Sequence, residues 1–284
     1  MPKLLLNTIA LDPNRWTAGK EPFFSLSPLL HRSVAAGFHY FELWQYHLMH
    51  EPREVIEGLR NEAPDEGVLF PVAGLYPRLN VTGPARDREL ESLDAVLERA
   101  ALLDVPVVKM FVGDRGRGGL RNEEYDDAVV TMSTLARRAD SRGMTVAGEI
   151  HENTLFETIP SAIKFIEDVG ADNFRVCFQP LDFADTARTI DEFNIVRERV
   201  VHIHFQGRKG DAISLLREAD IDYGVFIRAL ARTGYNGTMA IEFVRDCVVD
   251  NPVDFNLQLV LANAVRDRDY LTGLARSEGL ELEY

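Results

Sequence analysis

The feature that most constrains the fold of this chain is an alternation of short β-branched runs with amphipathic stretches of helical period. Such an alternation is typical of parallel strands joined by crossover helices. Eight runs have the length and composition of strands, at residues 4–10, 40–45, 68–76, 105–112, 144–151, 174–179, 200–205 and 238–244. Eight βα units in 284 residues predict an α/β fold that closes into a (β/α)₈ barrel.

No Pro- or Ser-rich linker divides the chain, so we expect a single domain over residues 1–284. The least regular stretches, at 11–24, 76–86, 113–122 and 207–220, each follow a predicted strand. In barrels of this kind, the loops after the strands form the face that carries the active site. Long loops at these places are therefore what an enzyme would show.

The charge balance excludes several classes of partner. The chain has 31 Lys and Arg residues against 45 Asp and Glu residues, which gives a formal net charge of −14. A nucleic-acid-binding protein normally presents a dense cationic face, and an anionic membrane surface would repel this chain. We therefore expect neither nucleic acid nor a membrane as a partner.

Cysteine usage and the N-terminus favour a cytoplasmic location. The two cysteines, Cys177 and Cys247, form neither a disulfide framework nor a zinc-binding spacing. No apolar run approaches the ~20 residues that span a bilayer. The N-terminal apolar stretch is short and ends at Asp12-Pro13, so it indicates a strand and not a signal peptide.

Polar side chains interrupt three of the predicted strands. Glu149, His204 and Glu242 each lie near the end of a strand. Parallel strands that are buried on both faces are nearly continuous apolar runs, and a carboxylate there is costly unless it is paired or bound to a metal. Convergence on one divalent cation, Mn²⁺, Mg²⁺, Co²⁺ or Zn²⁺, explains all three residues. The alternative is three buried polar side chains that neighbouring groups satisfy.

Several segments also resemble a known family, most clearly over residues 145–244. The segments are VAGEIHENTLFETIPSAIKFIEDVG, VVHIHFQG and DIDYGVFIRALARTGYNGTMAIEF, with GFHYFELW similar to the family's second strand. The family is that of the xylose isomerase-like TIM barrels, which includes sugar isomerases, ketose 3-epimerases, inosose dehydratases and type IV endonucleases. The resemblance implies a barrel of this type with Glu149, His204 and Glu242 as ligands of one divalent metal ion.

The sixth strand departs from the family pattern. Where the family has Asp-Pro-Gly-His, this chain has Gln179-Pro180-Leu181-Asp182. Gln179 stands in the place of a metal-binding aspartate, and Asp182 in that of a histidine that contacts substrate. Gln179 is expected either to coordinate the ion through its neutral amide oxygen or to hydrogen bond to a neighbouring strand end. If Gln179 coordinates the ion, the site holds two carboxylates and binds its metal more weakly than a site with three. Asp182 could supply the third carboxylate.

The epimerase branch of the resemblance implies proton transfer through an enediolate on a small carbohydrate or polyol. Glu149 and Glu242 are the expected general base and acid, with His204 as a structural ligand. The expected substrate-binding residues are His151, Asp182, Arg208, Lys109, Glu42 and Trp44. For two of these residues a structural role is an alternative to substrate binding. His151 could be an exposed loop residue, and Glu42 could belong to an ion pair at the barrel floor.

Two other functions remain open, and a third, cleavage of abasic DNA, is disfavoured by the net charge of −14. A dehydratase of the inosose or dehydroshikimate type would use a similar site, with loss of a β-hydroxyl from the same enolate. Cleavage of abasic DNA would need three metals and more histidines than the seven present. A metal-free barrel with a binding or scaffold role is kept open by Gln179. A homo-oligomer is compatible with the sequence, which does not specify one.

Overall fold

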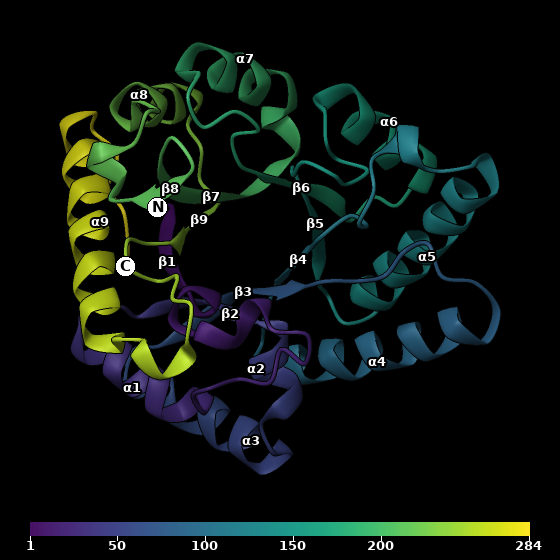
Figure 1. The fold of residues 1–284 in the computed structure, drawn as a ribbon, viewed down its shortest axis with the longest axis horizontal. Coiled ribbons are helices and arrows are strands. Elements are labelled where there is room, and N and C mark those ends of the chain that lie inside the picture. Colours follow the sequence, from purple (N-terminus) through teal and green to yellow (C-terminus); the bar gives the residue numbers. More distant parts are fainter.

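The computed structural model describes residues 1–284 and contains a closed barrel of eight parallel strands surrounded by helices (Figure 1). The barrel strands are β1 (Lys3–Asn7), β2 (Tyr40–Trp44), β3 (Leu69–Leu75), β4 (Val107–Met110), β5 (Thr145–Glu149), β6 (Phe174–Phe178), β7 (Val200–Lys209) and β9 (Thr238–Phe243). Each strand pairs in parallel with the next, and β9 closes the ring by pairing with β1. The predicted (β/α)₈ barrel is therefore confirmed.

The helices lie outside the ring, between successive strands (Figure 1). They are α1 (Leu26–Ala35), α2 (Gln45–His50), α3 (Arg53–Glu62), α4 (Gly83–Leu102), α5 (Asn122–Asp140), α6 (Ile159–Val169), α7 (Thr186–Val196), α8 (Tyr223–Thr233) and α9 (Leu257–Ser277). None of these helices is both long and apolar enough to cross a membrane. Gly170 and Gly234 end α6 and α8 in the left-handed conformation, with φ of 65° and 67°.

All eight predicted strands are present; six keep their expected limits to within two residues, and the first and seventh end further away. The first strand ends at Asn7 because the Asn7 side chain accepts a hydrogen bond from the Ile9 amide and starts a 3₁₀ turn, Thr8–Leu11. The seventh strand continues to Lys209 and pairs antiparallel with β8 (Ala212–Ser214), where the sequence predicted an irregular loop over residues 207–220. The hairpin depends on Gly207, since a Cβ at that position would lie 2.4 Å from the Ser214 carbonyl oxygen.

Alternation along the strands separates two kinds of interior. One set of side chains points outward and joins a core of 68 buried residues between the strands and the helices. The other set points into the barrel, where Leu5, Val72 and Ala240 form a small apolar layer. Later inward positions on the same strands are polar, as with Glu242 two residues after Ala240. The barrel therefore has an apolar floor below a polar upper layer.

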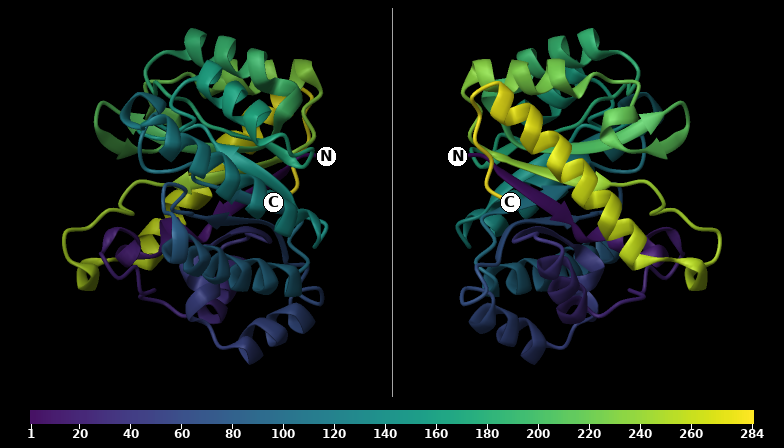
Figure 2. Two further views of the ribbon diagram at one scale, coloured as in Figure 1. Left: turned by 90° about the vertical axis from the view of Figure 1, so that its right-hand side faces the viewer. Right: turned by 90° about the vertical axis from the view of Figure 1, so that its left-hand side faces the viewer.

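The side views in Figure 2 distinguish the two ends of the barrel. Both chain termini lie at one end, where Leu4 N donates to Glu283 O, and the β7–β8 hairpin extends from the opposite end. The strands run toward the hairpin end, so the polar inward residues and the long post-strand loops are found there. This is the end at which (β/α)₈ enzymes carry their active sites.

We predict that Asp267→Asn stabilises the protein above neutral pH. Asp267 on α9 is buried, accepts a hydrogen bond from the Leu216 amide at 2.8 Å, and leaves Oδ2 without a partner. Burial raises the pKa of Asp267 from its ordinary value of 3.8 to about 7, so the folded state loses stability relative to the unfolded chain as the pH rises through this interval. At pH 8 the variant should gain about 2 kcal/mol in the free energy of unfolding by urea, and at pH 4 almost nothing.

The matched control is Asp269→Asn, two residues further along α9. The Asp269 carboxylate is 62% exposed and paired with Arg268. This control should change stability little at either pH. A gain for Asp267→Asn that is equally large at pH 4 and pH 8 would show that ionisation is not its cause.

Candidate active site and metal centre

The upper layer of the barrel interior holds a cluster of buried polar side chains from five strands. Its members are Glu42, Lys109, Glu149, His202, His204, Gln206 and Glu242. The members on one strand are two residues apart, as with His202, His204 and Gln206 on β7, so alternation directs all of them inward. The three residues that the sequence predicted to converge, Glu149, His204 and Glu242, belong to this cluster.

His204 is the centre of the cluster. Its Nδ1 lies 3.1 Å from Glu149 Oε1 and 3.4 Å from Glu242 Oε1, and its Nε2 lies 2.9 Å from Glu42 Oε2. Burial by itself would lower the pKa of His204, but the surrounding acidic groups raise it well above its usual range. One imidazole therefore bridges carboxylates from β2, β5 and β9.

Glu42 links the two histidines of β7 below this centre. Its Oε2 accepts hydrogen bonds from His202 Nε2 at 3.0 Å and from His204 at 2.9 Å, while Oε1 has no partner. His202 also contacts Thr238 Oγ1 at 2.7 Å through Nδ1. Burial raises the pKa of the Glu42 carboxyl, but His204 and His202 outweigh this effect and lower the pKa well below its usual range. Glu42 is thus buried beneath His204 and does not line the cavity described below, although the sequence suggested a substrate contact.

Lys109 on β4 forms a buried ion pair with Glu149. The Lys109 Nζ lies 2.8 Å from Glu149 Oε2 and 3.3 Å from the Tyr76 hydroxyl, and both charged side chains are within 1% of full burial. Burial raises the pKa of Glu149, but the Lys109 ammonium and His204 lower it to about 2. Glu149 is therefore ionised at neutral pH. Lys109 was expected in the substrate wall, yet it lies behind Glu149 with its ammonium directed to that carboxylate.

Gln179 follows β6 and contacts the cluster through Gln206. The Gln206 Nε2 donates to Gln179 Oε1 at 3.2 Å and to Glu242 Oε2 at 3.3 Å. The hydrogen bond to a neighbouring strand, one of the two alternatives for Gln179, is therefore present. Asp182 lies apart from the cluster, where it accepts a hydrogen bond from the Ala184 amide at 2.9 Å.

The donor atoms fit a divalent cation at Glu149, His204 and Glu242. One ligand atom from each residue lies within 4.8 Å of the other two. The His204 ring has the arrangement expected of a metal ligand, because Nε2 contacts a carboxylate while Nδ1 faces the other two acids. With His204 neutral, as a metal ligand must be, the three carboxylates of the cluster exceed the Lys109 ammonium by two charges, which a divalent ion would neutralise. Gln179 could add only a neutral oxygen.

A second group, formed by Cys177, His202 and His204, also has ligand atoms within 4.8 Å of one another. It contains no carboxylate, and burial raises the pKa of the Cys177 thiol to about 11. His202 is also held at both ring nitrogens by Glu42 and Thr238. Glu149, His204 and Glu242 are therefore the better candidate set.

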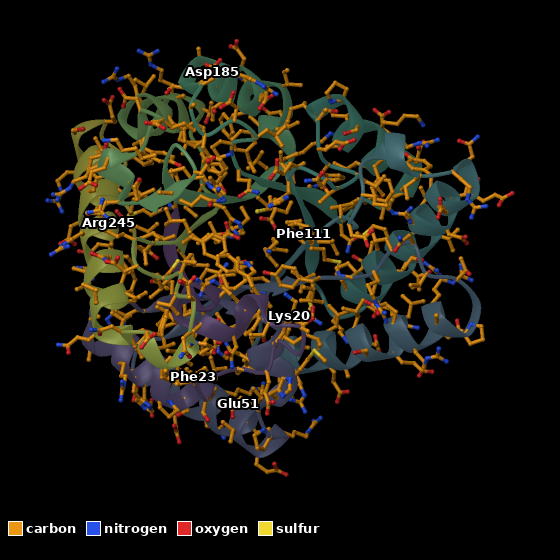
Figure 3. The ribbon with its side chains drawn as sticks, in the orientation of Figure 1. Lys20, Phe23, Glu51, Phe111, Asp185 and Arg245 are labelled. Carbon is orange, nitrogen blue, oxygen red and sulfur yellow. The ribbon has the colours of Figure 1, made fainter.

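A cavity of about 340 Å³ opens above Glu149 and Glu242. Its wall is formed by Ile9, Arg15, Trp16, Lys20, Trp44, Tyr76, Phe111, His151, Gln206, Arg208 and Phe243. Figure 3 shows two of these residues, Lys20 and Phe111, beside the central opening of the barrel. The aromatic rings of the wall can pack against the apolar face of a small molecule, while the two carboxylates on the floor contact its polar groups.

Three predicted substrate-binding residues lie on this wall: Trp44, His151 and Arg208. The His151 ring packs against Phe111 at 4.6 Å between centroids, and His151 Nδ1 lies 2.7 Å from the Glu152 carbonyl oxygen. Arg208 Nε donates to Gln206 Oε1 at 3.1 Å. Asp182 lies instead in an adjoining cavity of about 540 Å³, which shares His151, Gln206 and Arg208 with the first.

Several wall residues are not among those predicted from the sequence. Tyr76 and Phe111 each directly follow a barrel strand, and Gln206 is two residues after His204 on the same face, so strand position alone could have indicated them. Arg15 and Lys20 lie in the loop over residues 11–24, which was predicted to be an irregular loop on the active-site face of the barrel. Nothing in the sequence of that loop shows which side chains turn inward.

Comparison with known proteins gives a family match over most of the chain. The model of a family described as "Xylose isomerase-like TIM barrel" matches residues 30–261. A curated protein of Bacillus anthracis named 3-dehydroshikimate dehydratase is 21% identical over 191 residues, which is 66% of this chain and 68% of that protein.

Solved structures match at the level of the fold. A D-tagatose 3-epimerase-like protein has a TM-score of 0.74 at 17% identity, covering 98% of both chains. A xylose isomerase-like TIM barrel protein from Mycobacterium smegmatis, in complex with magnesium, has a TM-score of 0.71 at 16% identity, also covering 98% of both chains. At these identities the likeness extends to the barrel and not to the chemistry.

We predict that Lys109→Met destabilises the protein by about 3–5 kcal/mol in urea unfolding, because it leaves the Glu149 carboxylate buried without its partner. The double variant with Lys109→Met and Glu149→Met should recover most of this loss, since two apolar side chains of similar volume replace the pair. Lys164→Met, which removes an exposed pair with Asp168 at 2.6 Å, serves as the control and should cost less than about 1 kcal/mol. Equal losses in the single and double variants would contradict this account of the pair.

Proposed function

Because the chain belongs to the xylose isomerase-like TIM barrel family, we propose that it is a metal-dependent isomerase or epimerase of a small carbohydrate or polyol. The reaction would proceed by removal and return of a proton on the carbon beside a carbonyl, through an enediolate. The observation that carries the proposal is the convergence of Glu149 and Glu242 on one face of His204, at 3.1 Å and 3.4 Å, below a cavity that both carboxylates line.

The two carboxylates suit the roles of general base and general acid. Glu149 comes from β5 and Glu242 from β9, so they reach the cavity floor from strands separated by β6 and β7. A substrate carbon held above them can lose a proton to one side chain and receive one from the other. Glu149 is held ionised and oriented by Lys109 and His204, which makes it the better candidate for the base.

Glu149, His204 and Glu242 would hold the divalent cation, with the amide oxygen of Gln179 as a neutral fourth ligand. When bound, such an ion supplies Lewis-acid stabilisation of the negative charge that develops on the carbonyl oxygen. Ligation by Gln179 would require Gln206 to release Gln179 Oε1, whereas Glu242 could coordinate through Oε1 and keep its hydrogen bond from Gln206 at Oε2. His204 keeps its hydrogen bond to Glu42 through Nε2, which fixes the ring while Nδ1 faces the ion.

The cavity wall would orient the substrate and exclude water from the reacting carbon. Trp44, Tyr76 and Phe111 supply flat apolar faces, and His151 and Arg208 supply hydrogen-bond donors at the edge. Glu149 and Glu242 are the only carboxylates that line this cavity, so the substrate would meet its acid and base on the cavity floor.

Dehydration is the second candidate function. It is favoured by the sequence match to the 3-dehydroshikimate dehydratase of Bacillus anthracis. The first step would be the same proton abstraction by a carboxylate, after which the enolate would lose a β-hydroxyl. The products distinguish the two reactions, because a dehydratase creates a conjugated enone that absorbs in the ultraviolet, whereas an epimerase or isomerase does not.

We predict that Glu149→Gln and Glu242→Gln each reduce turnover by at least about 10³-fold, because each removes a proton-transfer group. The measurement is incorporation of solvent deuterium beside the carbonyl across a panel of ketoses and cyclic ketones, followed by ¹H NMR. Glu198→Gln makes the same change in charge at an exposed position before β7 and should retain full exchange. Near-normal exchange in either active-site variant, with circular dichroism like that of the parent, would contradict the two-carboxylate mechanism.

We also predict that Gln179→Asp tightens Mn²⁺ binding about tenfold or more in titration calorimetry, because it adds a third carboxylate at the site. Treatment of the parent protein with EDTA should abolish turnover, and Mn²⁺ should restore it. Gln258→Asp on the exposed side of α9 is the control and should leave Mn²⁺ affinity unchanged. Absence of Mn²⁺ binding in both the parent and Gln179→Asp would favour a metal-free binding barrel.

A further inference from the structure

The charge of the cavity wall is opposite to that of the chain. Across the whole sequence, acidic residues exceed basic ones by 45 to 31. The cavity of about 340 Å³ is lined by three basic side chains, Arg15, Lys20 and Arg208, against the carboxylates of Glu149 and Glu242. A local excess of positive charge on a strongly acidic protein points to an anionic ligand.

None of these three basic side chains has an acidic partner within 4.0 Å; each is held by neutral acceptors. The Arg15 guanidinium donates to the carbonyl oxygens of Asp12 and Cys247, and its Nε is buried without any partner. The Lys20 ammonium donates to the Arg15 carbonyl oxygen at 2.8 Å, and Arg208 Nε donates to Gln206 at 3.1 Å. Their positive charges therefore remain available to a ligand.

The two carboxylates on the cavity floor cannot neutralise these charges, because they are already paired. Glu149 contacts Lys109 at 2.8 Å and His204 at 3.1 Å. Glu242 contacts His204 at 3.4 Å and accepts from Gln206 at 3.3 Å. A divalent cation at the proposed centre would make the cavity more positive still.

Packing holds the basic groups in place around the cavity. The Arg15 guanidinium carbon lies 4.4 Å from the centre of the Trp16 ring and 5.6 Å from that of Phe243. The Lys20 ammonium is positioned by the Arg15 carbonyl oxygen at 2.8 Å and lies 5.9 Å from the centre of the Tyr46 ring; Figure 3 shows Lys20 beside the central opening. Such fixed charges need little reorganisation to bind an anion.

The adjoining cavity has the opposite character. It is lined by Glu152, Asp182, Asp211 and Asp220, against the basic side chains Arg188 and Arg208. Arg188 is already paired, at 2.8 Å from Glu192. The carboxylates of the adjoining cavity would repel an anionic group, which would be attracted to Arg15 and Lys20 in the first cavity. Substrate hydroxyl groups could donate hydrogen bonds to these carboxylates. The two cavities thus define one orientation for an anionic polyol.

We propose that the substrate carries a carboxylate or phosphate group in addition to its hydroxyls, and that Lys20 and Arg208 bind this group above the fixed charge of Arg15. This inference rests on the proposed function for the reacting end of the molecule. The cationic wall itself does not depend on which reaction takes place there. A carboxylate and a phosphate share the anionic oxygens that these side chains recognise.

The test uses three six-carbon ligands that lack a ketone or aldehyde group and so cannot react by this route: D-gluconate, D-glucitol 6-phosphate and neutral D-glucitol. Affinities are measured by titration calorimetry on the full chain in EDTA, which prevents chelation of metal by gluconate. At least one anionic ligand should bind about tenfold or more tightly than D-glucitol. The stronger of the two identifies the substrate anion as carboxylate or phosphate. Equal affinities for all three ligands would overturn the proposal.

Two variants and a control locate the binding group. Lys20→Met should weaken the anionic ligand about tenfold and leave D-glucitol unchanged. Arg208→Met should also weaken the anionic ligand about tenfold, and by more than it weakens D-glucitol, which loses only a neutral hydrogen bond. Lys209→Met removes an exposed charge next to Arg208, outside both cavities, and should change neither affinity. Unchanged anion affinity in both cavity variants would also overturn the proposal.

Failure of this inference and failure of the proposed function give different results. Tighter binding of an anionic ligand than of D-glucitol, without deuterium exchange on any carbonyl compound, would contradict the proposed reaction and support the cationic site. Exchange on neutral ketoses without anion preference would support the reaction and overturn the cationic site.

Discussion

The upper barrel depends on one imidazole, that of His204. It contacts Glu42, Glu149 and Glu242, which come from three strands around the ring. A carboxylate buried alone in this interior would cost several kcal/mol, so each acid is tolerable only with a partner. Lys109 supplies the remaining positive charge beside Glu149. The polar layer above the apolar floor can therefore form only if these strands close into a ring.

The same set of charges decides what the site can bind. Gln179 brings no charge where the family pattern has an aspartate, and Lys109 adds a positive charge beside one of the two acids on the cavity floor. Both features make the floor less negative than three free carboxylates would. Together with the basic side chains on the wall, they give an acidic protein a cavity suited to anions.

Much of the fold and part of the site could be predicted from residue patterns. The eight strands were found because a period of two alternates with helical periods along the chain, and the convergence of Glu149, His204 and Glu242 followed from their places at strand ends. The β7–β8 hairpin was missed, because its pairing depends on the close approach of Gly207 to Ser214. Lys109 was expected on the wall because periodicity gives the face of a residue but not its partner.

Residue order is enough to specify the barrel, the inward direction of the polar residues and the acidic overall charge, because alternation and composition are local properties. The pairing of Lys109 with Glu149, the contact of Glu42 with both histidines, and the inward turn of Arg15 and Lys20 arise from the folded arrangement. These contacts join residues from different strands and loops. Their distances depend on strand stagger and loop path, which residue order alone does not specify.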